Sequence, residues 1–328
     1  MPVNLSRPGQ KLGAGADDAL IIEQYGGEVE GTFAKQSFMR QYVKIKSIRG
    51  TNVVTNDRIG KATLTTVTPG VRPDASVVQF DNVSVKVDTI VLARNNTVLI
   101  DDFTSHYDVR AELGKEHGKE IAKFFDESFI IQAIKCAMIV KGDGTLGTTK
   151  LPDGWFGGTK VTLALANDEN DPVKLLAAIK EACKGIEKKD VDLDGAVIIC
   201  TVDAYYTLLD NDKLVNSQYS LGNGNYAEGQ VLKANGIPVV KTNRIPSAAI
   251  VGHKLSNAGN ANAYDVSAAE AKAVAIVMLP KALLAGELIP LTSKVHYSDI
   301  ELQWFIDSYL SYAVTPNRAE NCAVVLKA

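Results

Sequence analysis

The chain has 328 residues, of which 46% are hydrophobic and 22% are charged, and its formal net charge is −3. These values are typical of soluble globular proteins, and the length is sufficient for two or three structural units around a sizeable core. The sequence has no basic stripe and no apolar stretch long enough to cross a bilayer. It therefore predicts neither sequence-specific nucleic-acid binding nor membrane association.

Residues 1–18, MPVNLSRPGQKLGAGADD, are rich in glycine, proline and polar residues. They lack periodicity, so we expect them to be either disordered or an extended arm. They also lack the apolar core of a signal peptide, so we expect a protein that folds in a reducing cytoplasm. A short helix before Gly26-Gly27 leads to FAKQSFMRQYVKIKSIRG (33–50), which we expect to form a strand.

Residues 50–88 contain short β-prone runs, TNVVT, KATLTTVT, ASVVQF and NVSVKV, separated by turn residues. Val83, Val85 and Val87 alternate with polar residues, so one side of the last run can face a neighbour. The remainder is mostly Thr, Asn and Asp, which offers too little apolar surface for a core, and an isolated hairpin is marginally stable. We therefore expect a ribbon that lies either on its own domain or on another subunit.

The segment 105–140 predicts one unusually long helix, preceded by a strand at 88–101. Ser105 can cap its first turn, with Asp108 three residues later, and no proline interrupts it. Its N-terminal half is charged on most faces, whereas its C-terminal half is almost continuously apolar. Such a helix is either a coiled-coil arm or a rod that crosses a domain, and the lack of a sustained heptad favours the rod. The apolar stripe has helical spacing and consists of Val109, Leu113, Ile121, Phe124, Phe125, Ile131, Ile134 and Met138.

From Asp171 the pattern becomes α/β. Asp171 followed by Pro172 predicts a capped helix start, and Asp203 is expected to cap a second helix. The buried stripe of the first helix is expected to be Leu176, Ile179, Cys183 and Ile186. Strands are expected at 195–202, 237–246 and 273–279.

The last part of the sequence predicts β structure. Residues 294–316 alternate between apolar and polar, with a change of phase near Ser298-Asp299 that suggests a β-bulge. Pro316-Asn317 indicates a turn, and 322–328 a final strand. These strands are expected to lie alongside the long helix and to pair with strands from the region before it.

Residue patterns that would indicate catalysis or metal binding are weak. Gly142, Gly144 and Gly147 match GxGxxG, but a dinucleotide site needs a strand before the glycines and a helix after them, and neither is expected here. Asp101-Asp102 is better explained by the positive end of the helix that comes next. His106, His117, His253 and His296 lack metal-binding spacing, and His117 is expected to be a packing residue.

The four cysteines are scattered, and we expect buried free thiols at Cys136, Cys183, Cys200 and Cys322. The sequence therefore predicts no catalytic, cofactor-binding or metal-binding residue, and a protein that is not an enzyme.

Four stretches in order carry a resemblance to a known family: YGGEVEGTFAKQ (25–36), SHYDVRAELGKEHGKEIAKFFDESF (105–129), LKANGIPVVKTNRIP (232–246) and SYLSYAVTPNRAENCAVVL (308–326). The chain resembles the major capsid proteins of tailed bacteriophages, and is most similar to those of short-tailed, autographivirus-like phages. The resemblance implies an α+β fold with an N-terminal arm, an extended loop, a peripheral domain with a long spine helix, and an axial domain. Here these would be 1–25, 50–88, 26–49 with 89–160 and 286–328 (spine helix 105–140), and 161–285.

The resemblance implies a protein that self-assembles into hexamers and pentamers of an icosahedral shell around double-stranded DNA. Expected partners are other copies of the chain, a separate scaffolding protein, a portal protein at one vertex and possible decoration proteins, and the expected location is the virion, after assembly in the host cytoplasm. The alternatives are an encapsulin-type compartment of the same fold, and an α/β enzyme with an inserted β-ribbon.

Some members of the wider family form an isopeptide bond between a loop lysine and an asparagine of another subunit. The corresponding candidates here are Lys61, Asn317 and Asn321. The short-tailed members are not expected to cross-link, and activation of a lysine requires an apolar pocket that the sequence does not indicate. We therefore do not expect this bond.

Overall fold

The computed structural model describes residues 29–59, 64–70, 72, 78, 80–98, 109–139, 145–146, 149–150, 156–211, 214, 224–225, 230–231 and 233–328. The expected arm, Asp101-Asp102, Ser105 and His106, Lys61 and the three GxGxxG glycines lie outside these residues. The chain divides into two compact units. Unit 1 comprises the described parts of Met1–Phe38, Val87–Asp126 and Glu287–Tyr312, and unit 2 those of Met39–Lys86, Glu127–Gly286 and Ala313–Ala328.

The four-stranded sheet that contains most of the β structure of unit 1 is built from strands far apart in sequence. β4 (Val91–Val98) pairs antiparallel with β15 (Gln303–Pro316), and the sheet has the order β1-β14-β15-β4, with β1 at Ile45–Ser47 and β14 at Leu283–Ser298. This confirms the expectation that the late strands pair with the strand before the long helix. The predicted bulge near Ser298 is wrong, because the change of phase is a hairpin turn between β14 and β15. Leu302 in this turn has a left-handed backbone with φ of 51°.

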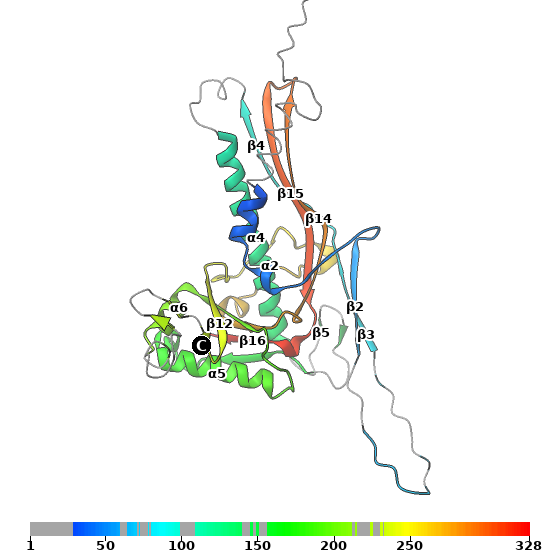
Figure 1. The fold of residues 1–328 in the computed structure, drawn as a ribbon, viewed down its shortest axis with the longest axis vertical. Helices are drawn as coiled ribbons and strands as arrows, with labels where there is room; N and C mark the ends of the chain where they lie inside the picture. The colour runs from blue at the N-terminus through cyan, green and yellow to red at the C-terminus, as the bar shows by residue number, and fades with distance from the viewer. Residues whose placement is uncertain are drawn as a thin grey trace, which may run out of the picture. The chain divides into compact units, whose positions relative to one another are not determined.

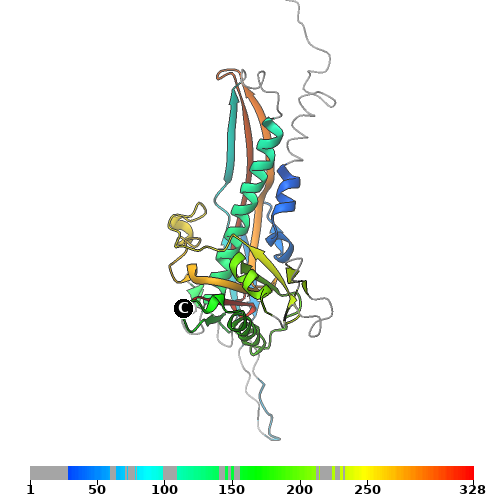
Figure 2. The same cartoon turned by 90° about the vertical axis from the view of Figure 1, so that its left-hand side faces the viewer.

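The long helix α4 spans Val109–Met138, which confirms most of the predicted segment 105–140. In unit 1 its N-terminal half runs along β14 and β15 (Figure 2). Phe125 packs edge-on against Phe33 with ring centroids 5.5 Å apart, and contacts Tyr312 at 4.8 Å. Asp126 is fully buried, and its carboxylate accepts hydrogen bonds from Ser37 Oγ at 2.8 Å and from the backbone N–H of Phe38 at 3.2 Å.

The expected strand at 33–50 is mostly wrong. Residues 29–36 are helical, α2 spans Met39–Tyr42, and only β1 is a strand. Val29, Phe33 and Ser37 are 0%, 2% and 3% exposed, so the buried face has the four-residue spacing of a helix. The strand was predicted from Val43 and Ile45, and the helical spacing of the residues before them was not recognised.

In unit 2 one stretch in the second half of α4 is buried on every side. All residues from Ser128 to Ile134 are at most 2% exposed. The only polar members of this run are Ser128 and Gln132, and the Gln132 amide donates to the carbonyl of Ala263 at 2.9 Å. This confirms the predicted contrast between a charged first half and an apolar second half.

The core of unit 2 is a six-stranded mixed sheet of order β11-β12-β8-β13-β16-β7. Helices α5 and α6 pack on one face through Leu175, Ile179, Tyr205 and Leu208, where they meet alternate strand residues (Figure 1). The Cys322 thiol, on β16, donates to the α4 carbonyl of Ala133 at 3.2 Å. The elements are β7 (Thr159–Thr162), α5 (Pro172–Glu187), β8 (Val197–Thr201), α6 (Val202–Leu209), β11 (Lys233–Ala234), β12 (Ile237–Thr242), β13 (Ala273–Met278) and β16 (Cys322–Leu326).

Short elements complete the described chain. The two-residue strands β5 and β6 pair with each other, as do β9 and β10. Their bounds are Thr145–Leu146, Thr149–Lys150, Gly224–Asn225 and Gln230–Val231, and single 3-10 turns occur at Asp168–Asn170, Ala258–Asn260, Glu270–Lys272 and Ala319–Asn321.

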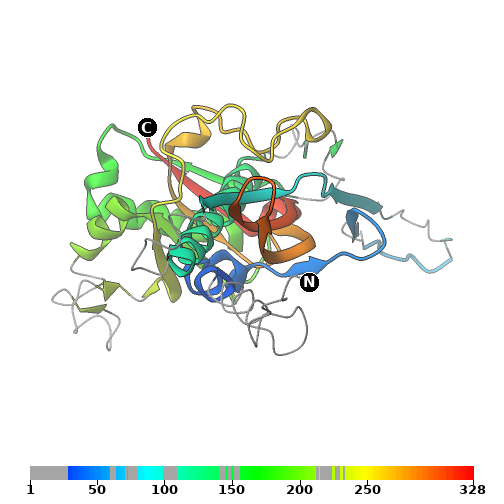
Figure 3. The ribbon, with the colours of Figure 1, turned by 90° about the horizontal axis from the view of Figure 1, so that it is seen from above.

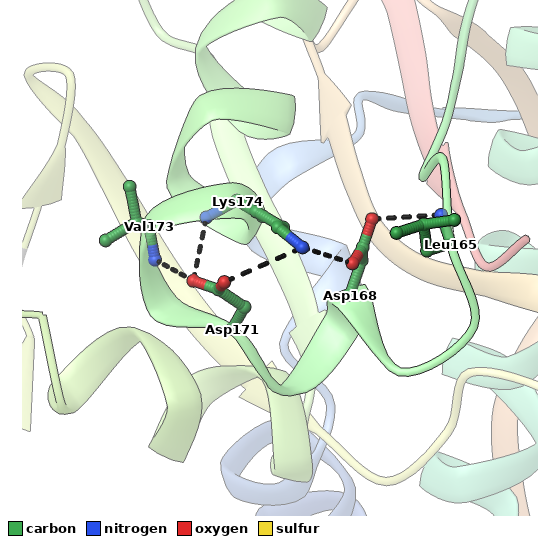
Figure 4. A network of polar contacts seen from close by, with 5 residues as sticks. All are labelled: Leu165, Asp168, Asp171, Val173 and Lys174. Atoms are coloured by element: carbon green, nitrogen blue, oxygen red, sulfur yellow. Dashed lines mark hydrogen bonds and ion pairs between the residues drawn. The ribbon is translucent and has the colours of Figure 1, made fainter.

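Helix α5 begins at the predicted cap. Asp171 Oδ1 accepts from the backbone N–H of Val173 at 2.9 Å and of Lys174 at 3.3 Å. The Lys174 ammonium lies 2.7 Å from Asp168, which also accepts from the backbone N–H of Leu165 (Figure 4). The hydrogen bond from Lys174 lowers the pKa of Asp168. This network holds the loop before α5 against its first turn.

Two details of the α/β prediction are wrong. Ile179, Cys183 and Ile186 of the predicted stripe are buried, but its first member is Leu175, which is fully buried, rather than Leu176, which is only partly buried. The cap of α6 is Thr201, whose hydroxyl accepts from the backbone N–H of Ala204 at 3.3 Å, rather than Asp203. Thr201 is still the last residue of β8, so strand and helix succeed each other without a linker.

The loop between β12 and β13, drawn in yellow in Figure 3, is tied into unit 2 by polar contacts. The Tyr264 hydroxyl donates to the carbonyl of Val314 at 2.9 Å and accepts from its N–H at 2.8 Å. Asp265 accepts from the N–H groups of Gly252 and His253, both at 3.1 Å. A polar Ala/Asn-rich segment without strands therefore has a defined conformation.

Candidate assembly interface

Chemical groups that could form an active site are dispersed. Among the described residues, no group of three or more His, Cys, Asp or Glu is placed to hold a metal ion. Cys136, Cys183, Cys200 and Cys322 are buried free thiols. None of the helices in the described part of the chain is long and apolar enough to cross a membrane.

The histidines of the described chain are structural in their contacts. His117 is buried on α4 with Nδ1 3.4 Å from the Ser308 hydroxyl, and this burial lowers its pKa. The His253 ring stacks on Tyr264 and its Nδ1 accepts from the backbone N–H of Leu255 at 3.2 Å. His296 stacks on Phe305.

The ribbon, defined here as β2 (Val53–Ile59), β3 (Phe80–Lys86) and the described residues 64–70 between them, has two different faces. The strands pair antiparallel, with Val53 opposite Lys86 and Ile59 opposite Phe80. Because side chains alternate along a strand, Val54 and Arg58 lie on one face and Ile59 lies on the other.

The inner face of the ribbon is anchored in unit 2. Val54, Arg58 and Val83 are 6%, 1% and 7% exposed. Val54 packs where β14 carries Gly286, because a Cβ at Gly286 would come within 2.5 Å of Val54 Cγ2. Arg58 forms an ion pair with Asp81 on β3. The base of the ribbon therefore lies on its own subunit, one of the two arrangements that the sequence allows.

The far end of the ribbon exposes large apolar side chains. Ile59 and Phe80, a cross-strand pair, are 59% and 75% exposed, and Leu64 and Val67 are 99% and 64% exposed. Exposed apolar groups gathered on one projecting element mark a protein-interaction site. The ribbon thus combines an anchored base with an end suited to contact another surface.

A second exposed apolar site lies in unit 1, in the hairpin turn between β14 and β15. Ile300 is 94% exposed and Leu302 57%. A leucine in left-handed conformation costs about 1–3 kcal/mol, a strain that persists where the surrounding structure demands it.

The two candidate asparagines for an isopeptide bond have structural contacts. Asn317 is 8% exposed; its side-chain oxygen accepts from Asn56 at 3.0 Å and its side-chain nitrogen donates to the Lys281 carbonyl at 3.2 Å. Asn321 is 5% exposed, and its carbonyl accepts from the N–H of Leu279 at 3.1 Å. Sequence reasoning missed Arg58, although its spacing from Val54 in β2 places it on the buried face.

Comparison with known proteins identifies the family to which the chain belongs. The family model of Gp10A-like major capsid proteins matches residues 83–310. None of the curated proteins matches the chain.

Solved structures of phage capsids are similar over nearly the whole length. The mature capsid protein of bacteriophage PhiM1 is 28% identical, with a TM-score of 0.73 over 89% of this chain and 87% of that chain. The capsid protein of cyanophage P-SCSP1u is 18% identical, with a TM-score of 0.75 over 89% and 88% of the two chains. A chain from a structure of Mycobacterium phage Che8 is 16% identical, with a TM-score of 0.58 over 84% of each chain.

These matches confirm the α+β phage-capsid fold and disfavour both the encapsulin-type compartment and the enzyme. A capsid protein acts by assembling into a shell, which accounts for an anchored ribbon with an exposed apolar end. The chain belongs to the Gp10A-like family of phage major capsid proteins and is a structural component of the virion.

Proposed function

We propose that this chain forms the hexamers and pentamers of an icosahedral shell that encloses double-stranded DNA. The observation that carries the proposal is the ribbon, whose base is buried on its own subunit while Ile59 and Phe80 are exposed at its outer end. A second copy of the chain is the partner available at every such ribbon in a closed homo-oligomer.

We also propose the finer assignments implied by the sequence. The capsid is of the short-tailed, autographivirus-like type, it assembles in the host cytoplasm with a separate scaffolding protein, and a portal protein occupies one vertex. Decoration proteins are a further possible partner. The proposed domains are the arm 1–25, the extended loop 50–88, the axial domain 161–285, and the peripheral domain formed by the remaining segments.

The elements support this division in part. β2 and β3 lie within the proposed extended loop, and α4 with β4 lies within the proposed peripheral domain. β8, β12 and β13 lie within the proposed axial domain. By its position in the sequence, β16 falls in the proposed peripheral domain, but it is a strand of the same sheet as β13.

We propose that the wall is nearly indifferent to the DNA it encloses. On α4 the exposed charges occur as i,i+3 pairs of opposite sign, Glu112 with Lys115, Glu116 with Lys119, and Glu120 with Lys123. Such pairs cancel each other's charge, and tight DNA binding requires clustered cations that release counterions. A shell that bound its contents tightly would oppose packaging and ejection.

Expression of the chain with its phage's assembly proteins tests the proposal. Sedimentation and electron microscopy should show large closed particles, and purified subunits should bind duplex DNA only weakly at moderate salt in a filter-binding titration. A small, discrete oligomer as the end product would contradict the shell. Submicromolar DNA affinity with a steep salt dependence would contradict the indifferent wall.

Hydrogen exchange should distinguish the two ends of the ribbon. In the free subunit, amides of the paired segment from Val54 to Arg58 should be protected, because both strands and the inner face are ordered. Amides at 64–70 should exchange quickly, since no described residue in that range is in a strand. On assembly they should become protected by at least about tenfold, and equal strong protection in both states would contradict an inter-subunit role.

A further inference from the structure

We infer that Asn56, Arg58, Asp81 and Asn317 form a latch that fixes the direction in which the ribbon leaves its subunit, and that this direction determines which shell is built. The inference rests on the proposed function and adds to it the residues that set the geometry of assembly. These four residues are named the ribbon latch.

The ribbon latch joins both strands of the ribbon to one point. Arg58 Nη1 donates to the carbonyl of Asn317 at 2.6 Å, and Nη2 bonds the carboxylate of Asp81 on β3. Asn56 Nδ2 donates to Asn317 Oδ1 at 3.0 Å. A guanidinium is a planar fork whose two contacts restrict rotation, so Arg58 orients the ribbon as well as attaching it.

The receiving side of the latch is itself held firmly. The backbone N–H groups of Asn317 and Arg318 both donate to the carbonyl of Ala282, at 2.8 and 3.2 Å. Asn317 Nδ2 donates to the carbonyl of Lys281, just before β14 begins. Asn317 therefore ties the ribbon to the chain on both sides of the β14–β15 hairpin.

A second contact fixes the direction of the ribbon as well as its point of attachment. Val54 packs against the bare backbone at Gly286, four positions before Arg58 on the same strand. Two anchors about 13 Å apart along a strand define a line, whereas one anchor would permit a swing. Both anchored side chains are buried, Val54 at 6% and Arg58 at 1% exposed.

The direction of the ribbon is important because its exposed apolar end begins at the residues next to the ribbon latch. Ile59 and Phe80 are the first exposed apolar pair beyond Arg58. Leu64 and Val67 follow this pair in sequence and are exposed, so a change in the direction of the ribbon at the latch would change where these side chains lie. Closed assemblies tolerate little change in the angle between copies, because an angle that does not close yields open or helical products.

A buried charge pair is an expensive way to gain stability, since desolvation offsets much of the attraction. Apolar side chains could have anchored the ribbon, as Val54 and Val83 do. The use of an arginine fork that contacts both Asn317 and Asp81 is better explained by the orientation that it imposes.

The test compares three asparagine-to-alanine variants. Asn317→Ala and Asn56→Ala each remove one end of the 3.0 Å latch bond. Asn82→Ala is the matched control, because Asn82 bonds Asp57 on the opposite face of the ribbon, outside the latch. All three subunits should fold, with melting temperatures within about 4 °C of the parent. The latch variants should give particles of mixed size and open sheets by electron microscopy, while the control should give uniform shells.

A distance distribution measured on unassembled subunits tests orientation directly. It would not change if the ribbon latch only stabilised the fold. The native thiols are buried, so spin labels can be placed at F80C beyond the latch and at K180C on α5. The distance distribution should broaden in Asn56→Ala and Asn317→Ala and stay narrow in Asn82→Ala. If Asn317→Ala lowers the yield of folded subunit, Asn56→Ala decides, because it removes the same bond from the ribbon side.

Uniform shells and a narrow distribution in both latch variants would overturn the inference, and so would equal disorder in the Asn82→Ala control. If the parent chain forms no shell at all, the proposed function fails, and the distance distributions still decide whether the latch orients the ribbon.

Discussion

Ile131→Asp is expected to leave no folded subunit. Ile131 is 1% exposed in the part of α4 where every residue from Ser128 to Ile134 is buried. A carboxylate there loses its hydration, which costs several kcal/mol and is comparable to the whole stability of a domain. Asp126, one turn earlier, shows what a buried carboxylate needs, since Ser37 and Phe38 both donate to it. Gln132 is the polar neighbour in the buried run, and its amide is already bonded to Ala263.

Two matched variants show whether charge at a buried position is responsible. Ile131→Val keeps the site apolar and should cost about 0.5–1.5 kcal/mol. Glu116→Lys reverses a charge on the exposed half of the same helix, where the Glu116 side chain is 57% exposed, and should cost no more than about 1 kcal/mol. Yield of folded protein and thermal melts measure all three. Similar behaviour of Ile131→Asp and Glu116→Lys would show that the contrast between the two halves of α4 is wrong.

Among the glycines of the described residues, Gly158→Ala should be the substitution to alanine that destabilises the protein most. Gly158 lies beyond the end of α4, and its N–H donates to the carbonyl of Ile139 at 2.6 Å. An added Cβ would lie 2.2 Å from the carbonyl oxygen of Ala137 and 2.5 Å from its carbonyl carbon. Both are backbone atoms of Ala137, which is 1% exposed, so no side-chain rotation can relieve the clash. Overpacking of this kind costs about 1–3 kcal/mol or more.

Gly31→Ala is the matched control for that experiment. Gly31 lies in the helical segment 29–36, is exposed, and a Cβ there would meet nothing within 4 Å. Since alanine is the better helix former, the change should stabilise unit 1 by up to about 1 kcal/mol. Denaturant midpoints of the two variants should therefore move in opposite directions. A Gly158→Ala subunit as stable as the parent would show that the close approach to Ala137 is not required.

Long periodic elements were predictable from sequence because their pattern repeats many times. Helix α4 was indicated by apolar spacing along its whole length, and the start of α5 by the pair Asp171-Pro172. The pairing of late strands with the strand before α4 was indicated by a shortage of partners elsewhere. Each of these rests on local spacing or capping, which a sequence displays directly.

The errors occur where two local patterns compete or where the deciding contact is distant. Val29 and Phe33 form a short helical face that contacts α4, yet Val43 and Ile45 suggested a strand. The change of phase near Ser298 is compatible with a bulge and with a hairpin, and only the partner strand distinguishes them. In α6, Thr201 and Asp203 are both good capping residues, and the end of β8 decides between them.

The interface was predictable as a region but not in its residues. The low apolar content of 50–88 indicated a ribbon that needs a partner. The alternation along β2 places Arg58 on the same face as Val54, but its burial could not be derived, because arginine is normally exposed and its partner Asn317 is 259 residues away. The sequence indicated Asn317 only as a candidate for an isopeptide bond.

The position of β16 has a consequence for synthesis of the protein. β16 lies in the interior of its sheet, between β13 and β7, and pairs in register with Ala273–Met278 on one side and Thr159–Thr162 on the other. These partners leave the ribosome long before residues 322–326 do, and they wait with unpaired edges until translation reaches Cys322. We expect a chain that terminates before Asn317 to lack both this interior strand and one member of the ribbon latch, so that its subunit does not fold and does not enter the shell.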